Sequence, residues 1–205
     1  MSRMPLEERR EALVAATLAV VERDGIGGAT TRAIVTEAGM PLGALHYAFA
    51  SVDHLLAAAI DAVTDQERIV AEAPLATGTG ADLTEVLAAG VEGYVSLLVE
   101  RPARELAYLE LMLHASRQRL DDGPGAGGYE RSYDVLAGLL ETAAATAGCV
   151  WTAPPRALAR HAVAMLDGIT TTWLADHDTE AAMAGARFLA SALAAHATGR
   201  PTEED

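Results

Sequence analysis

The stretch from Thr30 to Leu55 constrains the fold most, because it reads as two short helices, a tight turn and the start of a third helix. Gly39 lies at the turn, where a residue without a Cβ can enter the left-handed region that ends a helix. Pro41 has the fixed φ that suits the start of the next helix. Two helices joined by so few residues must cross steeply, so the stretch predicts helix-turn-helix geometry.

Apolar spacing predicts which faces of the two short helices are buried. The positions expected to face inward are Ile34, Val35 and Ala38 in the first helix and Leu42, Leu45 and Phe49 in the second. The step of about 100° per residue then places Gly43, Ala44 and Tyr47 on the opposite side, with His46 at the flank. Such a helix can lie in the major groove of DNA, with small residues near the bases and Tyr47 and His46 bonded to phosphates or base edges. The alternative is a small exposed helix without a ligand.

Positions between Arg10 and Leu56 also follow a recurrent pattern, carried by Leu13, Val14, Ala16, Gly25, Thr30, Thr31, Ile34, Ala38, Gly39, Gly43, Leu45, Phe49, Ser51 and Leu55. In this register the chain resembles the N-terminal domain of the TetR family of transcriptional regulators. The family pattern runs an Ile-Leu-x-Ala-Ala helix, a Gly, Thr-Thr, Ala-Gly, Gly-x-Leu-Tyr-x-His-Phe and then Ser-Lys-x-x-Leu. The resemblance implies a DNA-reading head and an effector pocket in the C-terminal region.

The departures from the family pattern are Pro41 in place of Ser, His46 in place of Tyr, Ala48 in place of His and Val52 in place of a phosphate-binding Lys. They lie on the side expected to face DNA, so the remaining polar side chains must supply more of the phosphate contacts. Arg3 and Arg10 can add charge from the first helix. The residues predicted to contact DNA are Thr30, Thr31, Arg32, Pro41, Gly43, Ala44, His46, Tyr47 and Ser51.

The formal net charge of −14 argues against a simple nucleic-acid binder, because duplex affinity rests on cationic side chains. Residues 1–55 hold five Arg against seven acidic residues, a net charge of −2, and residues 56–205 hold ten Arg against twenty-two, a net charge of −12. The acidity therefore lies mostly in the distal part of the chain. We expect modest, salt-sensitive DNA affinity that needs a dimer to become useful.

Composition predicts an all-α fold, because 51% of the 205 residues are hydrophobic while only 4% are aromatic, and strands are poorly supported. About nine helices are expected, with a helix-turn-helix three-helix domain in residues 1–50. Residues 51–205 are predicted to form a larger ligand-binding and dimerisation domain that begins with a connecting helix over 51–73. Its further helices are expected near 82–99, 102–119, 129–147, 156–175 and 179–197.

The last two helices carry wider apolar faces than a lone domain of this size needs, which predicts a four-helix bundle across a two-fold axis of a homodimer. The residues expected at this interface are Leu158, Met165, Ile169, Leu189 and Leu193. The alternative is that these faces form an intrachain core.

Four large or amphipathic side chains stand out in an interior built mainly of Ala and Leu, namely Tyr94, Tyr108, Met112 and Trp173. They can line a cavity for a small-molecule effector, with Tyr hydroxyls as the orienting polar groups. The alternative is an ordinary core in which each Tyr keeps its hydroxyl at the surface.

Motifs for other chemistry are weak. The G-P-G-A-G-G run at 123–128 fits G-x-G-x-x-G but follows a helix and not a strand, so no cofactor is predicted. Glu110 and His114 lie four apart and could begin a metal site, but a surface hydrogen-bonded pair is favoured, and no metal is predicted. No catalytic constellation can be argued, so an enzyme is not expected.

The sequence holds one cysteine, Cys149, and no uninterrupted apolar stretch of about 18 residues, so a cytoplasmic protein that does not span a membrane is expected. The overall prediction is a ligand-responsive transcriptional regulator, more a repressor than an activator, that a small-molecule effector releases from a double-stranded DNA operator. One alternative is a helical ligand-binding or scaffold protein with a degenerate helix-turn-helix. A third reading is a small helical enzyme that uses Glu110 or His114.

Overall fold

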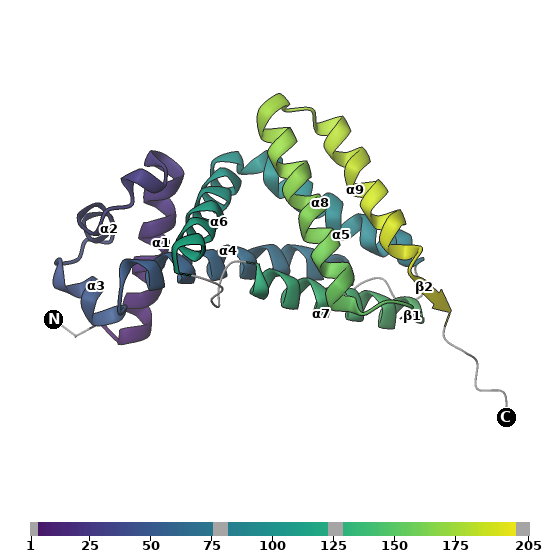
Figure 1. Ribbon diagram of the computed structural model, residues 1–205, viewed down its shortest axis with the longest axis horizontal. Coiled ribbons are helices and arrows are strands. Elements are labelled where there is room, and N and C mark those ends of the chain that lie inside the picture. The colour runs from purple at the N-terminus through teal and green to yellow at the C-terminus, as the bar shows by residue number, and fades with distance from the viewer. Residues whose placement is uncertain (1–3, 76–81, 123–128, 200–205) are drawn as a thin grey trace. The chain divides into compact units, whose positions relative to one another are not determined.

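The computed structural model describes residues 4–75, 82–122 and 129–199. Across these residues the chain forms nine α-helices, which confirms the predicted all-α class (Figure 1). The helices are α1 (Leu6–Asp24), α2 (Thr31–Glu37), α3 (Gly43–Ala48), α4 (Val52–Leu75), α5 (Leu83–Glu100), α6 (Pro102–Asp122), α7 (Glu130–Ala147), α8 (Pro155–Asp176) and α9 (Thr179–Ala194). A short 3₁₀ turn, η1 (Ile26–Gly28), lies between α1 and α2.

Internal contacts divide the chain into two compact units. Unit 1 comprises Met1–Val63 and Ala103–Tyr129, and unit 2 comprises Thr64–Pro102 and Glu130–Asp205. The first turns of α4 and most of α6 therefore belong with the N-terminal helices, whereas the rest of α4 belongs to unit 2. The domain boundary that we placed between residues 50 and 51 stays a proposal.

The turn signals read from the sequence form the helix-turn-helix of unit 1. The Thr30 hydroxyl accepts a hydrogen bond from the Ala33 amide at 3.2 Å and so caps α2. Gly39 has a φ of 63°, a conformation that a side chain would strain. The Ala44 amide then donates to the Pro41 carbonyl at 2.8 Å at the start of α3.

The core of unit 1 consists of two apolar clusters. One joins α1, α2, α3 and the start of α4, and its fully buried members include Leu13, Ile34, Leu45 and Leu55. The other joins α1, α4 and α6 through residues such as Val21, Ile60 and Leu111. Together these clusters support the short helices α2 and α3, which are too short to be stable alone.

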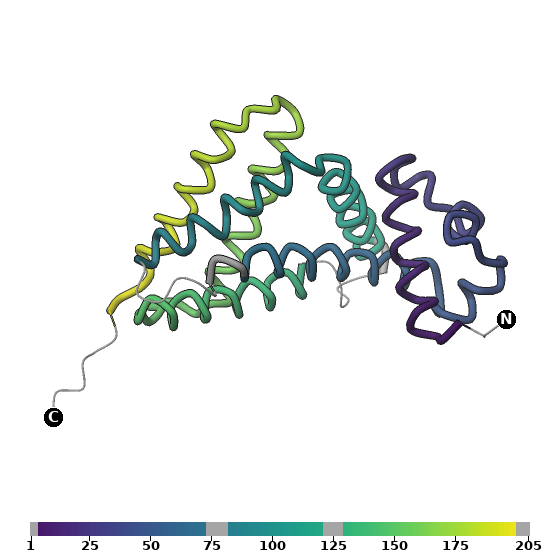
Figure 2. The backbone as a smooth tube through the Cα atoms, turned by 180° about the vertical axis from the view of Figure 1, so that it is seen from behind, coloured from purple at the N-terminus to yellow at the C-terminus, as the bar shows by residue number. Residues whose placement is uncertain are grey.

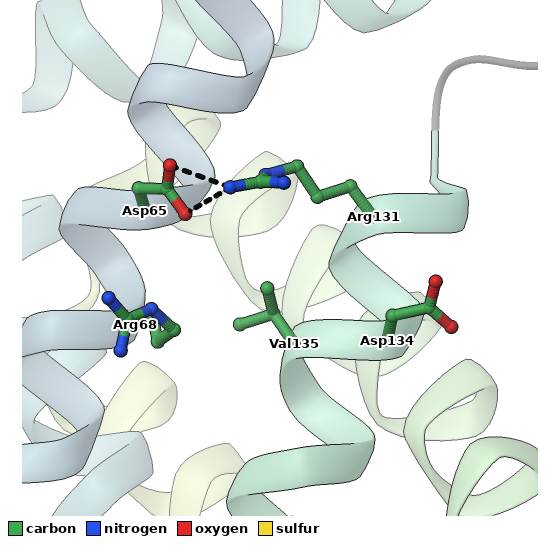
Figure 3. A pocket seen from close by; sticks show the side chains of 5 residues that line it. All are labelled: Asp65, Arg68, Arg131, Asp134 and Val135. Carbon is green, nitrogen blue, oxygen red and sulfur yellow. Dashed lines mark hydrogen bonds and ion pairs between the residues drawn. The ribbon is translucent and has the colours of Figure 1, made fainter.

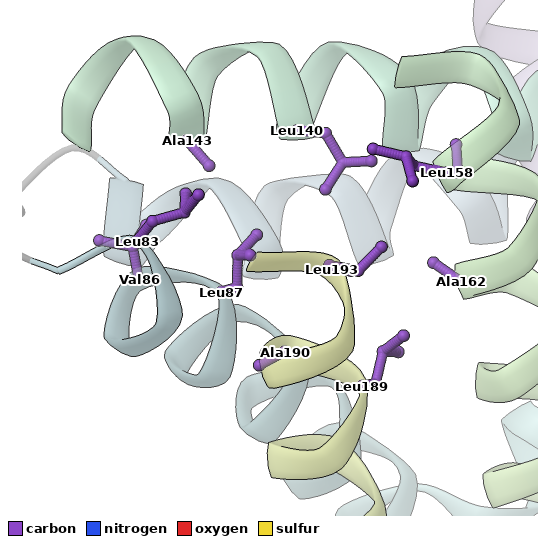
Figure 4. Packing of buried hydrophobic residues seen from close by; sticks show 11 residues of the cluster. Leu83, Val86, Leu87, Leu140, Ala143, Leu158, Ala162, Leu189, Ala190 and Leu193 are labelled. Carbon is purple, nitrogen blue, oxygen red and sulfur yellow. The ribbon is translucent and has the colours of Figure 1, made fainter. Parts of the chain in front are cut away.

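The main core of unit 2 is a layer of Leu, Val and Ala side chains from four helices (Figure 4). They come from α5 (Leu83, Val86, Leu87), α7 (Leu140, Ala143), α8 (Leu158, Ala159, Ala162) and α9 (Leu189, Ala190, Leu193). In both backbone views α9 lies against α5 and α8 (Figures 1 and 2). Small side chains let these helices approach closely: a Cβ added to Gly185 of α9 would lie 3.2 Å from the Ile169 side chain of α8.

The structure also contains a two-stranded antiparallel sheet that the sequence did not predict. Strand β1 (Cys149–Trp151) pairs with β2 (Ala197–Gly199), so α9 ends at Ala194 and not near Ala197 as expected. Gly148, with a φ of 68°, turns the chain from α7 into β1, and the Trp151 indole donates to the Leu140 carbonyl of α7 at 2.9 Å. Three-residue strands are too short to show an alternating pattern.

None of the helices among the described residues has both the length and the apolar character that crossing a membrane requires.

Candidate functional site

The exposed face of α3 differs by about one residue position from the predicted face. Leu42, expected to be buried, is 57% exposed, and Ala44, expected at the surface, is 8% exposed and buried. Ala44, Leu45, Ala48 and Phe49 form the inner side of the helix, and Gly43, His46 and Tyr47 lie outside with Leu42. With only six residues, α3 makes less than two turns, and Leu42 precedes its first residue. A small rotation of α3 about its axis is therefore enough to expose Leu42 and bury Ala44.

Two arginines of α1 flank α3. The Arg9 guanidinium lies 5.0 Å from the centroid of the Tyr47 ring, which places a cation beside a side chain of α3 that is 58% exposed. Arg10 instead donates to the Ala48 carbonyl at 3.2 Å and lies 4.6 Å from the Phe49 ring, so it holds the end of α3 in place. Arg3 lies outside the described residues. The sequence analysis missed Arg9, because its position depends on how α1 crosses α3.

The remaining predicted DNA contacts lie around this face with different exposures. Arg32 is exposed on α2, Pro41 is exposed in the turn, and Thr31 is half-buried. Thr30 is exposed, but its hydroxyl caps α2. The Ser51 hydroxyl accepts from the His54 amide at 3.2 Å and so caps α4. We therefore define the reading surface as Arg9, Arg32, Pro41, Leu42, Gly43, His46 and Tyr47.

A further arginine of the N-terminal helices, Arg23, bonds to two carboxylates. Arg23 lies 3.0 Å from Asp24 and 2.8 Å from Glu37, and hydrogen bonds to these two carboxylates raise the pKa of its guanidinium above the ordinary value. Phosphates would have to compete with both carboxylates for it. Arg32 is exposed, and Arg9 is half-buried and donates to the Met4 carbonyl at 3.3 Å, so these two arginines present positive charge beside α2 and α3.

The four predicted effector residues do not share one cluster. Tyr108 and Met112 are buried in unit 1 against residues of α1 and α4. Tyr94 and Trp173 belong to a cluster of unit 2, where the Tyr94 hydroxyl lies 2.5 Å from Thr170 Oγ1 and the Trp173 indole donates to Thr179 Oγ1 at 3.0 Å. The four residues thus lie in two separate core clusters, and the expectation that they line one effector cavity stays a prediction.

A pocket of about 700 Å³ instead opens in unit 2 between α4 and α7 (Figure 3). Asp65 and Arg68 of α4 and Arg131, Asp134 and Val135 of α7 line it. Arg131 Nη2 lies 2.6 and 2.7 Å from the two carboxylate oxygens of Asp65, and Arg68 Nη1 lies 2.5 Å from Glu72 Oε1. Its volume suits a small molecule, although its walls are more polar than most such sites.

Sequence reasoning missed this pocket, although a signal for it exists. An acid and an arginine stand three apart on α4, as Asp65 and Arg68, and in the reverse order on α7, as Arg131 and Asp134. Such spacing puts both charges on one helical face, but it does not say which helices meet.

The residues predicted at the dimer interface pack within the chain itself. Leu158, Leu189 and Leu193 are at most 5% exposed in the core of unit 2, Met165 packs against the same core, and Ile169 packs near Gly185. These side chains therefore belong to a core within the chain, as in the alternative given for the apolar faces of the last two helices. We define the outer face of α8 and α9 by the exposed residues Ala157, His161, Ala164, Gly168, Thr171, Ala181, Ala184, Phe188, Ala192 and Ala195.

Glu110 and His114 were expected to form a hydrogen-bonded pair at the surface, but each contacts a different residue. Glu110 Oε2 accepts a hydrogen bond from the Ile26 amide at 2.6 Å, and His114 Nε2 lies 3.8 Å from Asp53 Oδ1. The described residues contain no group of three or more His, Cys, Asp or Glu that could hold a metal ion. The glycine-rich run at 123–128 lies outside the described residues.

Residues 13–59, which run from within α1 to the first turns of α4, match the family described as "Bacterial regulatory proteins, tetR family". The HTH-type nicotine-responsive transcriptional repressor HdnoR of Paenarthrobacter nicotinovorans is 26% identical over 174 residues, 85% of this chain and 88% of that protein.

Two solved structures share the architecture. The multidrug binding protein EbrR, complexed with imidazole, is 32% identical with a TM-score of 0.64, and the match covers 97% of this chain and 99% of that one. SmeT, the repressor of the Stenotrophomonas maltophilia multidrug efflux pump SmeDEF, is 21% identical with a TM-score of 0.62, and the match covers 92% and 90%. The second likeness concerns the fold alone.

Proposed function

This chain belongs to the TetR family of bacterial regulatory proteins and is a DNA-binding transcriptional regulator, and we propose that it is a homodimeric repressor released from its operator by a small-molecule effector. The observation that carries the proposal is the reading surface. It combines a short helix, small enough to enter a major groove, with exposed polar and apolar side chains on a buried support.

Each part of the reading surface has a proposed role. Gly43 lets the α3 backbone approach the base edges, while His46 and Tyr47 bond phosphates or bases and Leu42 contacts a thymine methyl group. Arg9 and Arg32 neutralise phosphates on either side. A surface with so few cations binds weakly by itself, so operator binding requires two heads.

The proposed dimer places the outer face of α8 and α9 against its copy. The residues of this face are Ala, Gly, Thr and His161 around Phe188, which is 66% exposed, and the exposed Arg160, Glu180 and Arg187 of the same helices lie outside it. Small residues allow close helix packing, and an exposed aromatic ring provides an anchor for the interface. The two heads would then face successive major grooves, about 34–36 Å apart.

We further propose that the effector is a small organic cation that binds the pocket between α4 and α7. The relative HdnoR is nicotine-responsive by name, and residues 56–205 of this chain carry a net charge of −12. An incoming cation would take the place of Arg131 at the Asp65 carboxylate. Because Asp65 and Arg68 lie on α4, which continues into unit 1, such binding can alter the spacing of the heads and couple reciprocally to DNA binding.

Selection of genomic fragments by the purified protein tests the DNA claim. We expect enrichment of a two-fold symmetric sequence, and Tyr47→Ala should lose at least about tenfold in affinity for it while keeping the dimer. Nicotine and related cations are then titrated into the complex, where wild-type protein should release the DNA and Asp65→Asn should respond more weakly. Absence of any enriched fragment would instead favour a helical ligand-binding protein with a degenerate helix-turn-helix.

A further inference from the structure

The Glu110 side chain links α6 to the turn that precedes the helix-turn-helix. Its Oε2 atom accepts a hydrogen bond from the Ile26 amide at 2.6 Å, across 84 residues of sequence. Both residues are half-buried, and Ile26 packs beside a core cluster that includes Tyr108, Leu111 and Met112 of α6. The bond therefore adds a directional contact at a place where apolar packing already brings the segments together.

Gly25 makes room for this contact. Its φ of 73° turns the chain out of α1, and an added Cβ would lie 3.2 Å from Glu110 Oε2. Conformation and space therefore both favour glycine here. The turn exposes the Ile26 amide to the carboxylate.

A hydrogen-bonded turn connects Ile26 to the start of α2. The Ala29 amide donates to the Ile26 carbonyl at 3.1 Å, and the Thr30 amide donates to the Gly28 carbonyl at 2.7 Å. Thr30 then caps α2. A shift at Ile26 would therefore move the start of α2, and with it the reading surface on α2 and α3.

Electrostatics do not explain why a carboxylate occupies this place. The C-terminal end of α1 carries partial negative charge and favours cations, and Asp24 lies next to the turn. A neutral acceptor of the same shape would make the same hydrogen bond with less repulsion. The hydrogen bond to the Ile26 amide therefore requires an acceptor oxygen at this position and not a negative charge.

We propose that Glu110 is a positioning residue for operator binding, which holds the Ile26 amide so that α6 fixes the start of the helix-turn-helix. The proposal rests on the proposed function, because it requires that α2 and α3 contact DNA. It assigns to Glu110 a role that is neither metal binding nor catalysis.

The test compares Glu110→Gln with Glu110→Met in the chain of 205 residues. Both variants remove the charge and keep a side chain of similar length, but only Gln retains an acceptor oxygen. Operator affinity is measured by fluorescence anisotropy over a range of salt concentrations. Glu141→Met, at an exposed position of α7, is the control for loss of one acidic charge.

We expect Glu110→Gln to bind within about twofold of wild type and Glu110→Met to bind about tenfold more weakly, with a shallower salt dependence because fewer phosphates are contacted. Loss of a negative charge alone strengthens DNA binding, so a weakening by Met cannot come from the charge. Equal operator affinities of Glu110→Gln and Glu110→Met would overturn the proposal, whether both variants bind like wild type or both bind equally weakly.

Hydrogen exchange at the Ile26 amide provides a second readout that does not require the Met variant to fold. Protection in wild type and in Glu110→Gln is the expected result, and fast exchange in either protein would contradict the link.

Wild-type protein that binds no operator would refute the proposed function and not the contact, so the two failures are distinguished by the wild-type measurement alone.

Discussion

The two units are held together in different ways. In unit 1, polar side chains bond to backbone groups far away in sequence: Glu110 to the Ile26 amide, Arg104 to the Val63 carbonyl at 3.2 Å, and Arg10 to the Ala48 carbonyl. Unit 2 also has such bonds, from the Thr152 hydroxyl to the His196 carbonyl and from the Trp151 indole to the Leu140 carbonyl, both at 2.9 Å. Its main core, however, consists of Leu, Val and Ala, and its ion pairs, such as Arg131–Asp65, lie at the surface with about 45% of each side chain exposed.

This difference fits the separate tasks of the two units. Hydrogen bonds are directional, so they fix the orientation of α3 and of the turn before α2 as a DNA reader requires. Apolar packing is non-directional, and exposed ion pairs are weak and exchangeable. A pocket walled by such pairs can accept a charged ligand without breaking the core of unit 2.

The largest expected effect comes from the buried ion pair of unit 1. Arg104 and Glu105 are 2% and 0% exposed and lie 2.7 Å apart, so Arg104→Met removes a buried guanidinium that bonds to this buried carboxylate. We expect the free energy of unfolding in urea to fall by about 3–5 kcal/mol. The matched change in unit 2, Arg131→Met, should cost less than about 1 kcal/mol. Similar losses in both variants would remove the contrast between the units.

The second prediction tests the corrected face of α3. Leu45 is fully buried and Leu42 is 57% exposed. Leu45→Ala should lower the free energy of unfolding by about 2–5 kcal/mol through loss of apolar contacts and a residual cavity. Leu42→Ala should change it by no more than about 0.5 kcal/mol while weakening operator binding. A large stability loss for Leu42→Ala would restore the original assignment of the buried face.

The third prediction concerns assembly through unit 2. Phe188→Asp places a charge at the centre of the outer face of α8 and α9, where an aromatic anchor is expected to contribute about 2 kcal/mol or more. Sedimentation or light scattering should therefore show dissociation to monomer at concentrations at which wild type is dimeric. Far-ultraviolet circular dichroism serves as the folding control, since the ring is 66% exposed within the chain. A Phe188→Asp variant that stays dimeric would exclude this face.

The smallest effect is a pH-dependent cap in unit 2. Asp82 accepts from the Thr84 amide at 2.8 Å at the start of α5, and hydrogen bonds from Thr84 lower the pKa of its carboxyl. A lowered pKa in the folded state stabilises the fold above the unfolded pKa of about 3.9, and this contribution disappears as the pH falls through the folded value. The urea midpoints of wild type and Asp82→Ala should differ at pH 7 and converge below about pH 4. A constant difference would mean that the carboxylate charge is not involved.

Local sequence signals predicted much of the fold. The positive φ of Gly39 and most of the helix bounds followed from residues within one turn of each other, whereas the expected end of α9 was wrong. The exposed face of α3 did not, because six residues define a helical phase poorly. The ion pair across the pocket, the position of Arg9 and the separation of Tyr94 from Tyr108 depend on which helices pack together, and periodicity within one helix does not contain that information.

The most direct test of the account is the salt dependence of wild-type binding to its selected operator. The reading surface offers Arg9 and Arg32 from each of two heads, and each neutralised phosphate contributes about −0.9 to the slope of log K against log salt concentration. We therefore predict a slope of about −4 for the dimer. An affinity that does not change with salt, or the absence of any selected operator, would contradict the claim that this acidic chain reads DNA through α2 and α3.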